Sequence, residues 1–330
     1  MKHTSLYVAL FSIASTMTIS SSCTNKSGGA VSDNADSTVV SDSSDVEGLS
    51  FDTIATETLF KADTTRFSSI SMKMELPTAT DGVEGFIRSQ LCHIVGGCIS
   101  YINCYEDDSR FPLLEGKDVD NRKFFDYYFK NVSKAVATDA KSDYSEREKY
   151  YISDTTFTDE QRKEYLNTFP TWAYDYTLVK VADTLNYVVF LSQFYTYTGG
   201  AHGGIGGDGD LTFSKVDGKL IEHFVDSTKV EAMQPLLREG LKSYFAENGV
   251  KMTDNELFEN LQIGISGNER TIPLPMLQPF PTGEGLVFTY QQYEVACYAA
   301  GMPSFVVPYK KIAPYLTDEA SRLLEPYLKK

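Results

Sequence analysis

The chain has 330 residues, of which 42% are hydrophobic and 23% are charged, and its formal net charge is −15. These fractions are typical of a globular protein with one large or two modest domains, and they exclude a fibrous or largely disordered chain. So negative a surface repels phosphate backbones, which argues against a nucleic-acid partner, whereas it attracts cationic molecules or simply maintains solubility.

The beginning of the chain predicts export. Lys2 and a short apolar run over residues 7–19 are typical of a signal peptide, which we expect to span residues 1–22. Three serines lead into Cys23, as in a lipobox, although Ser20 stands where an aliphatic residue is usual. We therefore expect Cys23 to be acylated and to become the mature N-terminus, with an ordinary secretory leader as the alternative.

Residues 23–50 predict a flexible tether. They are rich in Ser, Gly and Asp without apolar periodicity, so they bury too little apolar surface to offset their chain entropy. No second apolar run of spanning length follows, which leaves the lipid as the expected contact with the membrane. We expect a cell-envelope lipoprotein of the outer membrane, and whether its folded part faces the periplasm or the surface stays open.

Four further cysteines are disulfide candidates in an oxidising compartment: Cys92, Cys98, Cys104 and Cys297. Residues 98–104 have the composition of a strand, whose six steps span roughly 20 Å. A disulfide needs Cα atoms within about 7 Å, so we do not expect a Cys98–Cys104 bond. The pairing Cys92–Cys98 with Cys104–Cys297 is preferred, and free buried thiols are the alternative.

The N-terminal half predicts a strand and two helices. Residues 64–77 alternate apolar and polar side chains, as in a half-buried strand. Residues 82–94 place apolar side chains, Val83 and Phe86 among them, on one stripe of a helix that the following glycine pair ends. A second amphipathic helix is expected over residues 121–137.

The middle of the chain changes from helical to extended patterns. Residues 143–166 are polar and rich in Tyr, which predicts short helices in a loop. The aromatic and β-branched runs at 171–183 and 185–199 predict two long strands. A glycine-rich loop over 199–210 and a further strand over 211–216 are expected to follow.

The C-terminal part predicts alternating short elements. Residues 230–248 form an amphipathic pattern that a glycine ends, and 254–261 predict a shorter helix. Strands are expected at 285–290 and 304–308, and helical turns at 310–328.

Ribbons and helices without βαβ regularity indicate an α+β fold with antiparallel or mixed sheets and flanking helices. We expect two subdomains, over residues 51–165 and 166–330.

Two potential ligand motifs lie in the glycine-rich segment. Gly204–Gly209 fits the dinucleotide fingerprint GxGxxG, but that motif requires a following helix and here a strand follows, so we reject it. Asp208 and Asp210 are potential calcium ligands, yet the other ligands of a calcium loop are missing. We therefore expect no metal and no cofactor.

His202 lies between glycines and is the most informative histidine. Flanking glycines allow a tight connection in which the imidazole bonds nearby backbone, and this structural role is expected first. They also allow close contact with a ligand or partner, whereas a zinc site with His93 and His223 is less favoured. The candidate binding residues are Tyr195, Tyr197, Gly199, Gly200, Ala201, His202 and Gly203.

Tyrosines are abundant after residue 160. Aromatic side chains anchor interfaces and stack on sugars, but most of these tyrosines alternate on strands and are expected to be core. They are Tyr165, Tyr174, Tyr176, Tyr187, Tyr195, Tyr197, Tyr290, Tyr293 and Tyr298.

Three segments resemble a known family. TYTGGAHG at 196–203 and TFSKVDGKLIEHFVD at 212–226 resemble the RsiV-type domain of unknown function, with Phe-Val-Asp in place of the usual Asp-Leu-Phe. Residues 288–316 are similar to the end of that domain, so the resemblance covers about 190–316. With weaker motifs, residues 51–165 resemble the PdaC-type domain that often precedes it.

The resemblance implies an α+β pair of domains without known catalysis. In the name-giving anti-sigma factor the extracytoplasmic part binds lysozyme, so we expect a cationic protein such as lysozyme, or a glycan such as peptidoglycan, as the partner. The sequence shows no sigma-binding region or membrane helix, so signalling to a sigma factor is not expected. The alternatives are an envelope hydrolase with His202 as general base and a purely structural envelope component.

Overall fold

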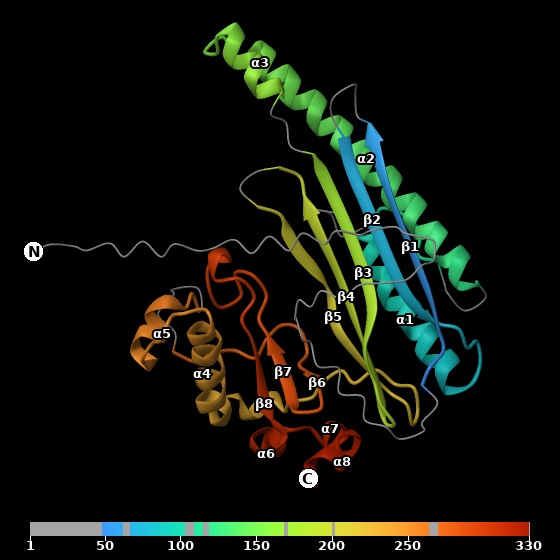
Figure 1. Cartoon of the computed structure of the whole chain (residues 1–330), viewed down its shortest axis with the longest axis vertical. Helices are drawn as coiled ribbons and strands as arrows, with labels where there is room; N and C mark the ends of the chain where they lie inside the picture. The colour runs from blue at the N-terminus through green and yellow to red at the C-terminus, as the bar shows by residue number, and fades with distance from the viewer. Residues whose placement is uncertain are drawn as a thin grey trace, which may run out of the picture. The chain divides into compact units, whose positions relative to one another are not determined.

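The computed structural model forms an α+β fold with a five-stranded mixed sheet and a three-stranded antiparallel sheet, which confirms the expected class (Figure 1). Residues 45–330 belong to one compact unit. The predicted signal peptide and tether up to residue 47, with Cys23, lie outside the described residues, as do Cys104, Gly200 and Ala201. The structure describes residues 48–61, 67–102, 109–114, 119–167, 171–199, 202–263 and 270–329.

The strands of the larger sheet are β1 (Phe51–Lys61), β2 (Phe67–Pro77), β3 (Trp172–Asp183), β4 (Tyr187–Tyr197) and β5 (Gly204–Ser214). They lie side by side in this order. β2 and β3 are parallel and all other neighbours are antiparallel. The parallel pair requires a crossover, which the helices between β2 and β3 provide.

This sheet crosses the expected domain boundary between residues 165 and 166. Met72 of β2 pairs with Tyr176 of β3, and both side chains are buried in the same core. The two expected subdomains therefore share one sheet. The core changes instead after β5, because the buried residues from Ile221 onward pack in a second cluster.

The glycine-rich segment, expected to be a loop, is the first half of β5. Gly204 and Gly206 pair with Thr196 and Phe194 of β4. A Cβ at Gly206 would lie 2.6 Å from the Phe194 ring, so glycine allows this strand to pass close to an aromatic side chain. The segment is itself a strand, which agrees with the rejection of a dinucleotide site.

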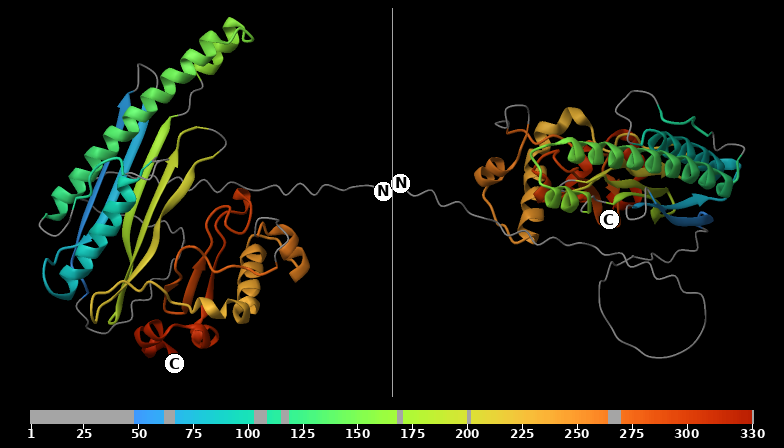
Figure 2. Two further views of the ribbon diagram at one scale, coloured as in Figure 1. Left: turned by 180° about the vertical axis from the view of Figure 1, so that it is seen from behind. Right: turned by 90° about the horizontal axis from the view of Figure 1, so that it is seen from above.

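Helices α1 (Gly82–Ser100) and α2 (Asn121–Ser153) cover one face of the larger sheet (Figure 2). They bury the apolar side chains of β2, whose predicted alternation is confirmed. Those side chains are Ile70, Met72, Met74 and Leu76.

α1 passes through the glycine pair that the sequence predicts as its end. A Cβ at Gly96 would lie 2.2 Å from the Tyr128 hydroxyl, so this glycine lets α1 approach α2 closely. Of the apolar stripe that the sequence predicts, Ile87 and Leu91 are buried, whereas Val83 and Phe86 are exposed by 36% and 47%. The stripe that faces the sheet is therefore rotated from the one that the apolar pattern predicts.

The predicted Cys92–Cys98 disulfide is wrong, because both thiols are free and lie on α1. Six residues along a helix separate them by about 9 Å. Residues 98–100 end this helix instead of beginning a strand. The strand that argued against a Cys98–Cys104 bond, and so favoured Cys92–Cys98, is therefore absent there. Cys297 is exposed and has no disulfide partner among the described residues, and Cys104 lies outside them.

α2 continues for 33 residues, well into the region expected to be loop. Trp172 at the start of β3 donates its indole N–H to Asp143 at 3.1 Å, which ties the extension to the sheet. The next helix, α3 (Asp159–Asn167), returns toward α2, and Tyr165 stacks on Tyr151 with ring centroids 4.9 Å apart. None of the helices within the described residues is both long and apolar enough to cross a membrane.

The second core forms around a smaller sheet, and its elements lie close to the sequence expectation except β6, which the sequence did not predict. The elements are α4 (Val230–Glu247), α5 (Asp254–Asn260), β6 (Phe280–Pro281), β7 (Gly285–Thr289), β8 (Ser304–Pro308), α6 (Tyr309–Ile312), α7 (Asp318–Leu323) and α8 (Glu325–Leu328).

β4 joins the two cores. Val188 and Phe190 belong to the core beneath α1 and α2, whereas Tyr187 and Val189 belong to the second core. A strand that is buried on both faces has a continuous apolar run instead of an alternation, as these four residues show. The C-terminal half of β4 is only partly buried, and there a polar surface begins.

Candidate functional site

One face of the larger sheet carries a row of polar and aromatic side chains. Asp175 lies between Tyr174 and Tyr176, which are buried beneath the helices, so its side chain points to the opposite face. The strand registers place Glu57, Ser71, Asp175 and Tyr195 side by side across four strands. Tyr197 lies in the neighbouring row, opposite Ala173. We call the surface formed by Glu57, Ser71, Asp175, Tyr195 and Tyr197 the outer face.

The carboxylates of the outer face lack cationic partners. Neither Glu57 nor Asp175 forms an ion pair with a described residue. Burial raises the pKa of Asp175, and the negative charge of Glu57 raises it further. The nearby Lys73 is already paired with Glu75 at 3.1 Å. The outer face therefore holds negative charge that the described part of the protein leaves uncompensated.

His202 lies exposed next to this row and is held by three contacts. Its Nδ1 is 3.0 Å from the Gly203 carbonyl oxygen, and its Nε2 is 3.1 Å from the Tyr293 hydroxyl. A carbonyl oxygen accepts hydrogen bonds only, so Nδ1 carries a proton, and in the neutral ring Nε2 accepts from Tyr293. The ring stacks on Tyr298 with centroids 3.6 Å apart and an interplanar angle of 14°. We call Tyr195, His202, Tyr293 and Tyr298 the His–Tyr cluster.

Tyr293 has an unusual backbone conformation. Its φ is +66°, and it is the non-glycine residue with positive φ among the described residues. This region costs free energy for a residue with a Cβ and often occurs at functional sites. Glu294 holds the turn, since its carboxylate accepts from the Gln291 and Met276 N–H groups at 2.7 and 2.6 Å. The strained turn presents a Tyr293 side chain that is 58% exposed.

Gly203 determines how closely the loop approaches Tyr195. A Cβ at Gly203 would lie 2.4 Å from the Tyr195 ring, so only glycine fits without a shift. Burial raises the pKa of Tyr195, with smaller contributions from Tyr298 and other neighbouring groups, whereas a hydrogen bond to the Gly203 backbone lowers it. The glycine expected to allow close backbone contact thus contacts a tyrosine of the same chain.

The structure brings together Tyr195, His202 and Gly203 of the predicted site residues. Tyr197 lies on the same face, and Gly199 has a φ of +106°. Sequence reasoning missed Tyr293 and Tyr298 as site residues. Their signal was the Tyr-rich C-terminal stretch, but their contact with His202, 91 residues away from Tyr293, depends on tertiary packing.

The expectation that most C-terminal tyrosines are core holds in part. The tyrosines of the cluster and Tyr197 are not fully buried, and Tyr165 is 41% exposed. The fully buried ones are Tyr174, Tyr176, Tyr187 and Tyr290.

Metal-ligating groups do not converge in the described residues, which contain no group of three His, Cys, Asp or Glu side chains that could hold an ion. His93 lies on α1, whereas His223 follows β5. Asp208 accepts a hydrogen bond from Ser192 at 2.9 Å. Asp210 has no hydrogen-bond or ionic partner among the described residues, and burial raises its pKa to about 7.

The segment that supplies Tyr293 and Tyr298 matches a known family. Residues 224–310 match the DUF3298 family, which is described as a protein of unknown function. This segment is a DUF3298 domain. It includes α4 and the smaller sheet, whereas Tyr195 and His202 precede it. The His–Tyr cluster therefore joins the DUF3298 domain to the strands before it.

Solved structures of DUF3298 family members resemble this chain. A crystal structure of a member from Bacteroides fragilis is 17% identical with a TM-score of 0.60, over 85% of this chain and 97% of that one. A family protein from Pseudomonas aeruginosa is 12% identical with a TM-score of 0.49, over 83% of this chain and 97% of that one. At 17% identity the first likeness shows a common fold alone. No curated protein matches the sequence.

Proposed function

We propose that this protein is a non-catalytic, lipid-anchored protein of the cell envelope that binds a cationic protein of the lysozyme type. The outer face and the His–Tyr cluster would form the binding surface. The observation that carries the proposal is the row in which the unpaired carboxylates of Glu57 and Asp175 lie beside Tyr195.

Charge supports a cationic partner. A Lys or Arg side chain between Glu57 and Asp175 would relieve their repulsion and lower the pKa of Asp175 toward its ordinary range. The net charge of −15 would also attract such a partner over longer distances and accelerate its encounter.

The aromatic side chains support a protein interface. Tyrosines are enriched among the residues that dominate binding energy, because they bury a large area at a small cost in side-chain entropy. The stack of His202 on Tyr298 and the hydrogen bond from Tyr293 hold these rings in place before a partner binds. Preorganisation of this kind reduces the entropy that association loses.

A cell-wall glycan such as peptidoglycan is the second candidate, because the exposed Tyr293 offers a flat ring on which a sugar would stack. Its binding would depend little on salt, whereas association of a cationic protein slows steeply as salt screens the charges. The salt dependence therefore separates the two partners.

The lysozyme-type partner also rests on the resemblance of residues 190–316 to the RsiV-type domain, within which the DUF3298 domain lies. The envelope location rests on the leader and on Cys23. We expect radiolabelled palmitate to label the wild-type protein and not the Cys23→Ala variant. Equal labelling of both would contradict the lipid anchor.

The decisive experiment measures binding of lysozyme to the immobilised full chain carrying Cys23→Ala, in a series from dilute to high salt. We expect the association rate to fall by a factor of about ten or more across the series, with a smaller change in dissociation. Glu57→Gln with Asp175→Asn should weaken binding about tenfold or more.

The matched control is Glu222→Gln with Glu259→Gln, which removes the same charge from exposed positions that have no ion pair among the described residues. Equal effects of the two double variants would mean that net charge alone acts. The absence of a lysozyme complex would overturn the protein-binding proposal, and salt-independent binding of peptidoglycan fragments would then favour the glycan.

A further inference from the structure

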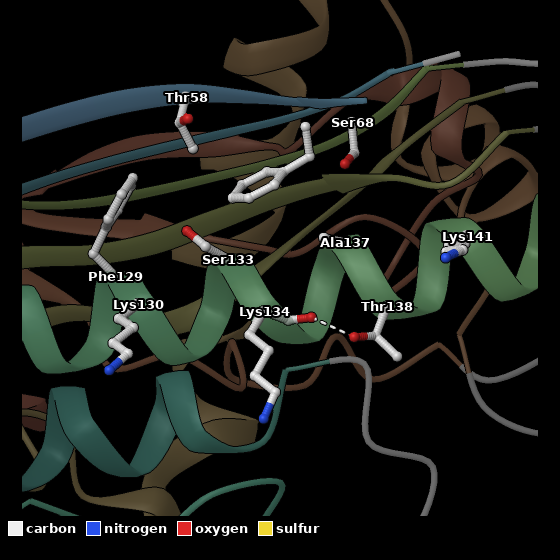
Figure 3. A pocket seen from close by; sticks show the side chains of 10 residues that line it. Thr58, Ser68, Phe129, Lys130, Ser133, Lys134, Ala137, Thr138 and Lys141 are labelled. Carbon is white, nitrogen blue, oxygen red and sulfur yellow. Dashed lines mark hydrogen bonds between the residues drawn. The ribbon is translucent and has the colours of Figure 1, made fainter. Parts of the chain in front are cut away.

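A second surface, on the opposite side of the same strands, has a different chemistry. A groove of about 810 Å³ lies between α2 and the side chains that β1 and β2 direct toward that helix (Figure 3). Its volume lies within the range of small-molecule sites. We call it the lysine groove; its lining is Thr58, Phe60, Ser68, Phe129, Lys130, Ser133, Lys134, Ala137, Thr138 and Lys141.

Positive charge gathers along this groove in an otherwise acidic chain. Lys130, Lys134 and Lys141 are exposed on α2, and none forms an ion pair with a described residue. Between the first and the last of these lysines α2 carries one acidic residue, Asp139, which Arg110 already neutralises in a two-contact pair. The local balance is therefore positive, although the whole chain has a net charge of −15.

Ser133 contributes a hydroxyl without a partner. Its side chain is 94% buried, since its relative exposure is 6%, and Oγ forms no hydrogen bond. In Figure 3 this oxygen points from α2 toward the strands, and Ser133 forms part of the groove wall. A buried hydroxyl without a partner destabilises the folded chain. By contrast, the Thr138 hydroxyl on the same helix is satisfied by the Lys134 carbonyl at 2.7 Å.

The rest of the lining is largely apolar. Phe60 from β1 and Phe129 from α2 line the groove together with Ala137. The stems of Lys130 and Lys134 run along the side of α2 away from the strands in Figure 3. Lysine stems are long and flexible, so their ammonium groups reach the groove by rotation while the stems cover apolar surface.

We propose that the lysine groove binds a single-chain amphipathic anion, such as a fatty acid. The alkyl chain lies against Phe60 and Phe129, and the anionic head group accepts hydrogen bonds from the lysine ammonium groups, with Ser133 donating to the ligand within the groove. A purely inorganic anion would leave the aromatic lining unused, and a neutral lipid would leave the lysines unused. The site is independent of the outer face, because alternate residues of β1 and β2 form the two surfaces.

A carboxylate and a phosphate head group share this chemistry, and titration calorimetry with the full chain carrying Cys23→Ala distinguishes them. The probes are laurate, dodecyl phosphate, dodecyl maltoside and inorganic phosphate, each below its micellar concentration where one exists. We expect laurate or dodecyl phosphate to bind at one site and to bind at least tenfold more tightly than the other two probes. Equally tight binding of dodecyl maltoside would overturn the role of the negative charge. Equally tight binding of inorganic phosphate would overturn the role of the alkyl chain.

Variants locate the site on the groove. Lys130→Gln with Lys134→Gln should weaken binding of the anionic amphiphile about tenfold, and Ser133→Ala should weaken it roughly two- to tenfold. The control Lys149→Gln with Lys163→Gln removes the same charge from exposed lysines of α2 and α3 outside the groove.

Thermal unfolding of each variant without ligand shows whether it is folded, and Ser133→Ala is expected to be at least as stable as wild type. A folded Lys130→Gln/Lys134→Gln variant that binds as tightly as its control would overturn the proposal. The absence of binding by every amphiphile would do the same.

Discussion

The outer face and the lysine groove use opposite sides of the same two strands and carry opposite charge. Along β1 the side chain of Thr58 lines the groove, so its neighbour Glu57 lies on the outer face. The outer face gathers carboxylates and tyrosines, whereas the groove gathers lysines and phenylalanines. A period of two thus allows one sheet to present two unlike surfaces to two unlike partners.

The two surfaces also share a property. Each keeps polar groups without partners among the described residues, namely Glu57 and Asp175 on one side and Ser133 on the other. Burial without a partner destabilises a folded chain, which concerns Ser133 and the half-buried Asp175, whereas Glu57 is exposed to water. We infer that these positions serve binding more than stability, and four predictions test this comparison.

The largest expected effect concerns Asp210, which lies on the side of β5 opposite the buried Leu211. Burial raises its pKa from 3.8 to about 7. The folded state therefore holds this proton more tightly than the unfolded chain, so stability is full below about pH 4 and falls as the pH rises through 7. Asp210→Asn should remove this loss and raise the free energy of unfolding at pH 8 by on the order of 2 kcal/mol.

Urea denaturation of wild type and Asp210→Asn at pH 5 and pH 8 measures the effect. Glu222→Gln is the control, since this carboxyl is exposed. The quantity compared is the difference in the free energy of unfolding between wild type and the variant. If this difference is the same at both pH values, a partner compensates the charge of Asp210.

The next effect concerns the close contact that supports the His–Tyr cluster. Gly203→Ala forces a Cβ into the Tyr195 ring and should lower the free energy of unfolding by about 1–3 kcal/mol. The neighbouring Gly204→Ala is a matched control, because its Cβ would meet nothing nearer than the Thr196 hydroxyl at 3.9 Å. Calorimetric melting of both variants tests the contact, and equal losses would refute it.

His202→Ala should have a smaller effect on stability, about 1 kcal/mol, because it removes one hydrogen bond to Tyr293 and the stack on Tyr298. Lysozyme binding should weaken as well, while His93→Ala on the surface of α1 should change neither. We expect no hydrolysis of glycan or ester substrates by either protein. Turnover by wild type that His202→Ala abolishes would favour the hydrolase alternative, in which the Nε2 lone pair acts as base.

The smallest effect should have the opposite sign. Ser133→Ala removes a buried hydroxyl that has no partner, so it should raise the free energy of unfolding by about 1 kcal/mol without ligand. The control Thr138→Ala removes an exposed hydroxyl that donates a hydrogen bond to the Lys134 carbonyl oxygen. A loss of stability in Ser133→Ala, measured by urea denaturation, would mean that the hydroxyl is satisfied in solution and is not reserved for a ligand.

Local periodicity was sufficient for much of the fold. The alternation over residues 64–77, the amphipathic helix α4 and the late strands lie where the sequence predicts them, because each pattern reports burial against one neighbouring layer. The glycines around His202 were also visible, since clustered glycines and a lone histidine are local features, but the strand that begins at Gly204 was not predicted there.

Errors arose where a residue has a distant partner. Gly96 resembled a helix end, but it is a contact point between α1 and the Tyr128 hydroxyl of α2. The helical pattern of α2 continued through residues that are polar in sequence, because contacts such as Trp172 with Asp143 stabilise its extension. Composition alone does not reveal such contacts.

The sequence by itself determined the acidic balance, the α+β class and the candidates Tyr195, Tyr197 and His202. Only the tertiary structure decided that Tyr293 and Tyr298 meet His202, and that Glu57 and Asp175 share one row. Cross-strand register and the packing of the DUF3298 domain on the larger sheet bring these residues together across long stretches of chain. Such juxtapositions follow from the free energy of the whole fold and not from any local window of sequence.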